Sequence, residues 1–176
     1  RVYDVAKKTP VTFATNLSAK LKNDVFLKRE DMQPIFSFKI RGAYNKIANL
    51  NQQQKKRGVI TASAGNHAQG VANACKKLKV PCFIVMPVTA PEIKVKSVKR
   101  FGSKVFLHGD NFDQASKKAR HMAKEQKLEF IEAFDDPLTI AGQGTVGKEI
   151  LDEDNNLDVI FVPVGGGGLL AGISAW

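Results

Sequence analysis

The chain has 176 residues, of which 43% are hydrophobic, and it carries a formal net charge of +10 at pH 7. This length and this apolar content are sufficient for one domain, or for two small lobes, with a packed core. No apolar run is as long as a membrane span, and no charged and then apolar leader opens the chain, so the sequence predicts neither a membrane segment nor a secretory signal.

The excess of basic residues raises the question of nucleic-acid binding. The lysines come in short pairs, on the polar faces of separate predicted helices: Lys55 with Lys56, Lys76 with Lys77, and Lys117 with Lys118. No basic tail and no alternation of basic with aromatic residues is present. We therefore expect a solvated basic surface, with no nucleic-acid and no membrane partner.

Cys75 and Cys82 both lie among apolar neighbours. This setting favours buried core thiols over a disulfide pair, which fits a reducing compartment and a cytoplasmic location. The histidines His67, His108 and His121 have neither the spacing nor the cysteine partners of a metal site, so no bound metal is expected.

Short β-branched runs alternate with helical patterns along the chain. The opening residues 1–6 are typical of the end of an amphipathic helix. Strands are predicted at 25–28, 59–62, 82–86, 104–107, 130–131 and 159–162, and helices at 38–50, 52–57, 66–75, 91–101, 111–123, 138–151 and from 169 onward. A helix cap before Pro137 is favoured over a catalytic carboxylate pair at Asp135 and Asp136. The alternation predicts an α/β fold with a parallel sheet, helices on both faces, and ligands beyond the carboxyl ends of the strands.

The glycine turn Gly165–Gly168 follows the most apolar predicted strand and precedes a helix. Consecutive glycines let several backbone amides point inward, which favours phosphate binding over a plain flexible turn. Neither common nucleotide fingerprint is met. Leu170 stands where the last glycine of G-x-G-x-x-G belongs, and Glu149 replaces the Ser/Thr of a Walker-like run at 142–148.

Two further segments carry reactive groups. Lys39 is flanked by Ile35, Phe36, Phe38 and Ile40, and burial there would lower its pKa and favour a nucleophilic amine, although a surface lysine is the common alternative. The turn 63–67 offers hydroxyl, amide and backbone donors at a helix start, which suits either a carboxylate site or an ordinary helix cap.

Four motifs together resemble one family. They are S-F-K-I-R-G-A, A-S-A-G-N-H-A-Q-G, A-G-Q-G-T and P-V-G-G-G-G-L. The chain resembles the pyridoxal-phosphate enzymes of the tryptophan-synthase-β fold (fold type II), and more closely the biosynthetic threonine dehydratases. The resemblance covers essentially the whole chain, but only about the first half of that family's catalytic region.

The resemblance implies roles for particular residues. Lys39 would form the Schiff base with pyridoxal 5'-phosphate, Phe38 would lie against its ring and Asn66 would bond its 3-hydroxyl. The glycines and the next amide would hold the phosphate: Gly165, Gly166, Gly167, Gly168 and Leu169. The substrate carboxylate would bind at Ser63, Ala64, Gly65, Asn66 and His67, with Gln143 lining the site. The partner of the pyridine nitrogen would lie beyond Trp176.

The implied reaction is the β-elimination of L-threonine to 2-oxobutanoate and ammonia, the first step of isoleucine biosynthesis, with Lys39 removing the α-proton. The alternatives are a catabolic serine/threonine dehydratase and a serine racemase. A racemase needs a second acid/base, a serine where this chain has Ala64, so dehydration is favoured.

The resemblance also implies a truncated two-lobe organisation. Residues 1–29 would open the larger cofactor domain, 30–138 would form the smaller domain, and 139–176 would begin the rest of the larger one. The abrupt ends agree with a piece of a longer protein, which would form a homo-oligomer at full length. An inactive cofactor-binding fragment is therefore a third hypothesis.

Overall fold

The computed structural model describes residues 1–176. Its elements, in chain order, are η1 (Val2–Asp4), β1 (Val11–Phe13), α1 (Thr15–Leu21), β2 (Phe26–Lys28), η2 (Glu30–Met32), α2 (Lys39–Ala48), α3 (Gln52–Arg57), β3 (Val59–Ala62), α4 (Asn66–Leu78), β4 (Cys82–Met86), α5 (Glu92–Lys99), β5 (Lys104–Leu107), α6 (Phe112–Glu125), β6 (Glu129–Phe130), α7 (Pro137–Glu153) and α8 (Gly168–Ile173). None of the helices combines the length and the apolarity needed to cross a membrane.

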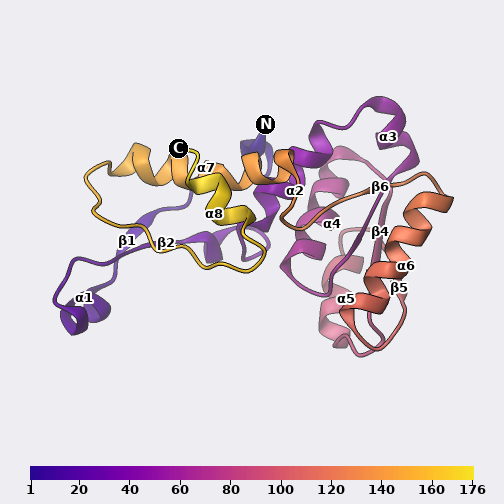
Figure 1. Cartoon of the computed structure of the whole chain (residues 1–176), viewed down its shortest axis with the longest axis horizontal. Coiled ribbons are helices and arrows are strands. Elements are labelled where there is room, and N and C mark those ends of the chain that lie inside the picture. Colours follow the sequence, from indigo (N-terminus) through magenta and orange to yellow (C-terminus); the bar gives the residue numbers. More distant parts are fainter.

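A four-stranded parallel sheet, in the order β5-β4-β3-β6, lies in one half of the molecule, at the right in Figure 1. Helices α4 and α5 cover one face and α6 covers the other (Figure 1). Successive residues of β4 show why both faces are covered: Ile84 belongs to the cluster beneath α4, whereas Val85 belongs to the cluster beneath α6. The predicted α/β fold with a helix-flanked parallel sheet is confirmed.

Helix α2 connects the sheet region to the rest of the chain, because it packs against both α4 and α7. Its buried side chains lie on one face, as the spacing of Ile40, Ala43 and Ile47 predicts. The contact with α7 is close: a Cβ on Gly42 would lie 2.6 Å from the Thr139 carbonyl oxygen, and one on Gly142 would lie 2.6 Å from the Cα of Gly42. Glycine is therefore required where the two helices cross.

Two predicted caps are present. The Asn111 side chain accepts a hydrogen bond from the Gln114 amide at the start of α6. Asp136 accepts hydrogen bonds from the Leu138 and Thr139 amides at 2.9 and 3.0 Å, and so begins α7 as a cap, as expected.

Several segments differ from the prediction, among them α1, where the sequence pattern predicts no helix. Residues 159–162 form no strand, because no neighbouring strand supplies backbone partners; Phe161 is 92% exposed. The opening residues form a single 3-10 turn rather than the end of an α-helix. A strand that was not predicted, β1, pairs antiparallel with β2, so not all strand pairs of the protein are parallel.

Candidate functional site

Lys39 is the first residue of α2, and its side chain reaches across to a distant segment. Its Nζ donates a hydrogen bond to the carbonyl oxygen of Ala133 at 2.8 Å and lies 5.2 Å from the centre of the Phe38 ring. Burial lowers the pKa of the Lys39 amine. One expected neighbour is not involved in this burial, since Phe36 is 72% exposed, in a left-handed turn with φ +57°.

The glycine turn packs against the same distant segment that holds Lys39. A Cβ on Gly166 would lie 2.3 Å from the Phe134 ring, and one on Gly168 would lie 2.6 Å from the Phe134 carbonyl oxygen. No heavy atom would lie within 4 Å of a Cβ on Gly165. Phe134 therefore supports the turn from one side and leaves part of its backbone open.

Lys39 and the glycine turn line one cavity of about 350 Å³. Its walls are formed by Phe38, Lys39, Ala133, Phe134, Gln143, Pro163, Val164, Gly165, Gly166, Gly167, Gly168 and Leu169. The structure thus brings together residues that are more than a hundred positions apart in sequence, as the resemblance implies.

Gln143 lines this cavity and carries one unpaired donor. Its Oε1 accepts a hydrogen bond from the Gly42 amide at 3.1 Å, which fixes the orientation of the side chain. Its Nε2 is buried and has no hydrogen-bond partner. An unpaired buried donor costs free energy, and this one lies at the contact of α2 with α7, because a Cβ on Gly42 would lie 2.5 Å from it.

The turn at Ser63–His67 lies at the carboxyl end of β3, but none of its residues lines the cavity. Ser63 Oγ accepts a hydrogen bond from the Gly65 amide at 3.1 Å, which shapes the turn. The helix that follows packs against the start of α2, since a Cβ on Gly70 would lie 2.9 Å from the Lys39 carbonyl oxygen. The turn is therefore held close to Lys39 by packing between helices.

His67 is buried and stays neutral at physiological pH. Its Nε2 lies 3.0 Å from the Ile131 carbonyl oxygen, to which the neutral ring donates, whereas its Nδ1 has no partner. Burial lowers the pKa of His67 to about 4, and the charge of Lys39 acts in the same direction. A neutral ring adds no positive charge beside the Lys39 amine.

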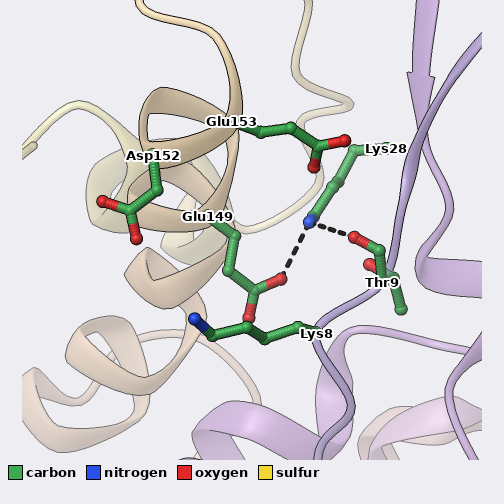
Figure 2. Close-up of a pocket in the computed structure, with 6 residues that line it drawn as sticks. All are labelled: Lys8, Thr9, Lys28, Glu149, Asp152 and Glu153. Carbon is green, nitrogen blue, oxygen red and sulfur yellow. Dashed lines mark hydrogen bonds and ion pairs between the residues drawn. The ribbon is translucent and has the colours of Figure 1, made fainter.

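A second cavity of about 160 Å³, lined only by polar and charged residues, lies beside the last turns of α7. Figure 2 shows Lys28 reaching between Glu149 and Thr9 in this cavity, with Lys8, Asp152 and Glu153 around them. The Lys28 Nζ lies 2.8 Å from Glu149. No group of three or more His, Cys, Asp or Glu side chains in the molecule is arranged to hold a metal ion.

Two residues on one wall of the first cavity, Ala133 and Phe134, carry no signal in the sequence. They follow β6 in a short irregular segment, where no periodicity or motif marks them. Arg41 belongs to the S-F-K-I-R-G-A motif, but its complete burial and its pairing with Glu30 and Glu149 were not predicted, because Glu149 lies 108 positions further along the chain.

The family model for pyridoxal-phosphate dependent enzymes matches residues 2–176. The chain belongs to this family. It is 55% identical to a biosynthetic L-threonine dehydratase of Pasteurella multocida over 174 residues, which are 99% of this chain and 34% of that protein. It is 53% identical to a mitochondrial threonine dehydratase of Saccharomyces cerevisiae over an alignment of 178 positions, which covers 99% of this chain and 31% of that protein.

Solved structures show the same relationship. A processed threonine deaminase isoform of Solanum lycopersicum superposes with a TM-score of 0.96 and 49% identity, over 98% of this chain and 47% of that one. A maize serine racemase superposes with a TM-score of 0.94 and 36% identity, over 98% of this chain and 53% of that one. The chain spans about a third of the length of the curated relatives.

The first cavity fits the cofactor of this pyridoxal-phosphate dependent family. An aldehyde needs a nucleophilic amine, and burial lowers the pKa of Lys39. A phosphate needs converging donors without side chains in the way, and the glycine turn supplies bare amides on the same wall.

Proposed function

We propose that this chain is part of a threonine ammonia-lyase that converts L-threonine to 2-oxobutanoate and ammonia, at the start of isoleucine biosynthesis. The observation that carries the proposal is the cavity that Lys39 shares with Gly165–Gly168. The names of relatives more than 50% identical over nearly the whole chain support the substrate.

In this proposal Lys39 holds the cofactor and later moves the α-proton of the substrate. The hydrogen bond to the Ala133 carbonyl keeps the amine at the cavity, and its lowered pKa makes the proton-free form more accessible near neutral pH. When bound, pyridoxal phosphate supplies an electron sink for negative charge at the substrate α-carbon.

The other predicted site residues bind and orient. The amides of Gly165, Gly166, Gly167, Gly168 and Leu169 bind the phosphate, Phe38 lies against the ring, and Asn66 bonds the ring hydroxyl. The turn at Ser63–His67 receives the substrate carboxylate, with Gln143 as a donor nearby. These roles require the turn to lie over the cavity entrance, with the helix pair α2 and α4 holding it beside Lys39.

Serine racemase is the competing activity, because the maize racemase has the same fold at 36% identity. Ala64 favours elimination, since a methyl side chain cannot return a proton to the opposite face of the α-carbon. A catabolic serine/threonine dehydratase would use the same site residues, and an inactive fragment would bind the cofactor in the same cavity without turnover.

We extend the proposal to the domain organisation and the cellular location of the full-length protein. Residues 1–29, 30–138 and 139–176 would belong to the larger, the smaller and again the larger domain of a homo-oligomeric protein. We propose a cytoplasmic location, although the yeast and tomato relatives are named as mitochondrial and chloroplastic proteins. Microscopy of the tagged full-length protein distinguishes these compartments.

The first test separates cofactor binding from turnover. The protein is incubated with pyridoxal phosphate, reduced with borohydride and digested, and the peptide masses are measured. We expect the adduct on the peptide that contains Lys39 and not on peptides with exposed lysines such as Lys117. Adducts spread over many lysines would contradict the assignment of Lys39.

The second test measures activity in the full-length protein. We expect 2-oxobutanoate from L-threonine in the parent and in the control variant Lys117→Ala, and loss of about a thousandfold or more in Lys39→Ala. Formation of D-serine from L-serine at a comparable rate would favour the racemase instead.

A further inference from the structure

The helix that begins at Lys39 starts differently from the other α-helices of the protein. In α1 and in α3 to α8, the carbonyl oxygen of the residue before the helix accepts a hydrogen bond from the amide four positions later, as Asp136 does from Ile140 at 2.8 Å. In α2 the Phe38 carbonyl oxygen accepts instead from the Arg41 amide, three positions later, at 3.0 Å. The first turn of α2 is therefore wound more tightly, as a 3-10 turn.

A side chain of α7 takes the place of the missing hydrogen bond. The Gly42 amide, which would donate to Phe38 in a regular helix, donates to Gln143 Oε1 at 3.1 Å. Gln143 is 1% exposed, and its Nε2 has no hydrogen-bond partner. A buried side chain with one polar group paired and the other unpaired adds little net stability. Stability alone therefore does not account for a glutamine at this position.

The glycines on either side of Gln143 bring α7 close to two other helices. A Cβ on Gly142 would lie 2.6 Å from the Cα of Gly42, so this glycine lets α2 approach. A Cβ on Gly144 would lie 2.6 Å from the Gly172 carbonyl oxygen, so this glycine lets α8 approach, the helix that directly follows the glycine turn. The A-G-Q-G-T motif therefore joins the two helices whose first residues line the cavity.

The first turn of α2 is also held from the side of α4. A Cβ on Gly70 would lie 2.9 Å from the Lys39 carbonyl oxygen, so α4 contacts the backbone of Lys39 itself. Gly42 lies three positions after Lys39, about one turn further along the same side of the helix. Gln143 holds it there from the side of α7. The backbone of Lys39 is thus fixed between α4 and α7.

We propose that Gln143 is a positioning residue for Lys39, an inference that rests on the proposed function. By accepting from the Gly42 amide, Gln143 keeps the first turn of α2 tightly wound and sets the direction in which the Lys39 side chain leaves the helix. Without this acceptor, the Gly42 amide turns to the Phe38 carbonyl oxygen, and the first turn relaxes to the form of the other helices. The relaxed turn moves the Lys39 amine relative to the glycine turn while the rest of the fold is kept.

This role separates two properties of the cavity, the binding of the cofactor and its attachment to Lys39. Binding depends on the glycine turn, which Gln143 does not contact through a hydrogen bond. Attachment requires the amine at attack distance, and a small displacement of a reacting group lowers the rate strongly. In this step the Lys39 nitrogen forms a C=N bond with the aldehyde carbon, and the aldehyde oxygen leaves as water with the two hydrogens of the amine.

The test uses the full-length protein, freed of cofactor, and two probes. Stopped-flow absorbance with pyridoxal phosphate measures the attachment rate, and borohydride reduction and digestion locate the adduct on Lys39. Equilibrium dialysis with 4'-deoxypyridoxine phosphate, in which a methyl group replaces the aldehyde, measures binding without attachment. Gln143→Met keeps the volume of the side chain but lacks the acceptor. In this variant we expect attachment to slow by about ten- to a hundredfold, and the affinity for the analogue to change by less than about twofold.

Asn45→Ala is the matched control. The Asn45 side chain donates to the Leu138 carbonyl oxygen at 2.7 Å, so this variant removes a different hydrogen bond between α2 and α7 and should leave both readouts unchanged. Gln143→Glu retains an acceptor oxygen and should restore attachment. Because a negative charge nearby favours the protonated amine, the rates are compared at high pH, where they no longer depend on pH. If Gln143→Met does not fold, Gln143→Asn, which is one methylene shorter, replaces it.

Three results would overturn the proposal. They are attachment at the parent rate in Gln143→Met, equal losses of attachment rate and analogue affinity in that variant, and no recovery in Gln143→Glu. The second result would mean that Gln143 only supports the fold. A parent protein that binds the analogue but never carries the adduct on Lys39 would instead contradict the proposed function, so the two failures are distinguishable.

Discussion

Arg41 and Glu149, 108 residues apart in sequence, form a buried two-point ion pair. The Arg41 Nη1 and Nη2 donate to the two Glu149 carboxylate oxygens at 2.6 and 2.9 Å. The same guanidinium donates to both oxygens of Glu30, and Lys28 lies 2.8 Å from Glu149. Two positive and two negative side chains thus neutralise one another between α2 and α7.

This network predicts a large loss of stability when Arg41 is removed. Arg41→Met leaves two buried carboxylates with Lys28 as their remaining cation, and we expect the free energy of unfolding to fall by about 3–5 kcal/mol. Urea denaturation measures this free energy of unfolding. The control is Lys148→Met, which breaks the exposed pair with Asp152 and should cost under about 1 kcal/mol. Equal effects from the two variants would contradict the buried network.

His67 predicts how stability depends on pH. Its pKa in the folded protein is about 4, below the ordinary value of 6.5, so between these pH values the unfolded chain binds a proton that the folded chain does not. The free energy of unfolding therefore falls as pH falls from 6.5 to 4, by up to about 3 kcal/mol from this residue.

His67→Gln tests this directly, since glutamine can still donate to the Ile131 carbonyl but does not titrate. We expect the slope of unfolding free energy against pH to flatten above pH 5. The exposed His121, changed to glutamine, serves as the comparison and should retain the slope.

Below about pH 4.5 the pH dependence of stability has a second source, Glu149. Although burial favours its neutral acid form, hydrogen bonds from Arg41 and Lys28 lower the pKa of Glu149. Its contribution is lost as pH falls through that range.

The packing of the glycine turn predicts that neighbouring glycines differ in how well they tolerate substitution by alanine. In Gly166→Ala and Gly168→Ala the new methyl group meets Phe134, so we expect a loss of about 1–3 kcal/mol in stability and weaker pyridoxal-phosphate binding. Gly165→Ala has open space and should change stability by under about 0.5 kcal/mol. Thermal unfolding and equilibrium dialysis with the cofactor measure the two effects. A more damaging change at Gly165 than at Gly168 in the absence of cofactor would refute the packing argument.

Asp136 combines a helix cap with an ion pair to Lys46 at 2.8 Å. Asp136→Ala removes both, and we expect stability to fall by about 1–2 kcal/mol. Asp136→Asn keeps a capping oxygen and should restore most of the loss. Asp135→Ala, at the exposed neighbouring position, should have little effect. Chemical denaturation of the three variants ranks them, and an asparagine variant as unstable as the alanine variant would show that the ion pair matters more than the cap.

The sequence by itself predicted most of the local elements and singled out two segments, Lys39 and Gly165–Gly168, that the fold brings to one cavity. Helical spacing places Ile40, Ala43 and Ile47 on one buried face, and Asn111 and Asp136 start helices as caps, because these signals depend on residues a few positions apart. The lysine at the start of α2 and the consecutive glycines before α8 can likewise be recognised from neighbouring residues alone. Motif resemblance then identified the family.

The tertiary structure decided what depends on distant partners. Residues 159–162 are apolar enough for a strand but form none, since a strand requires a neighbour with which to share hydrogen bonds. The buried charge of Arg41 is tolerated only because the fold places Glu30 and Glu149 around it. The cavity beside Lys39 likewise exists because Phe134 supports the glycine turn, a contact that no local pattern in the sequence encodes.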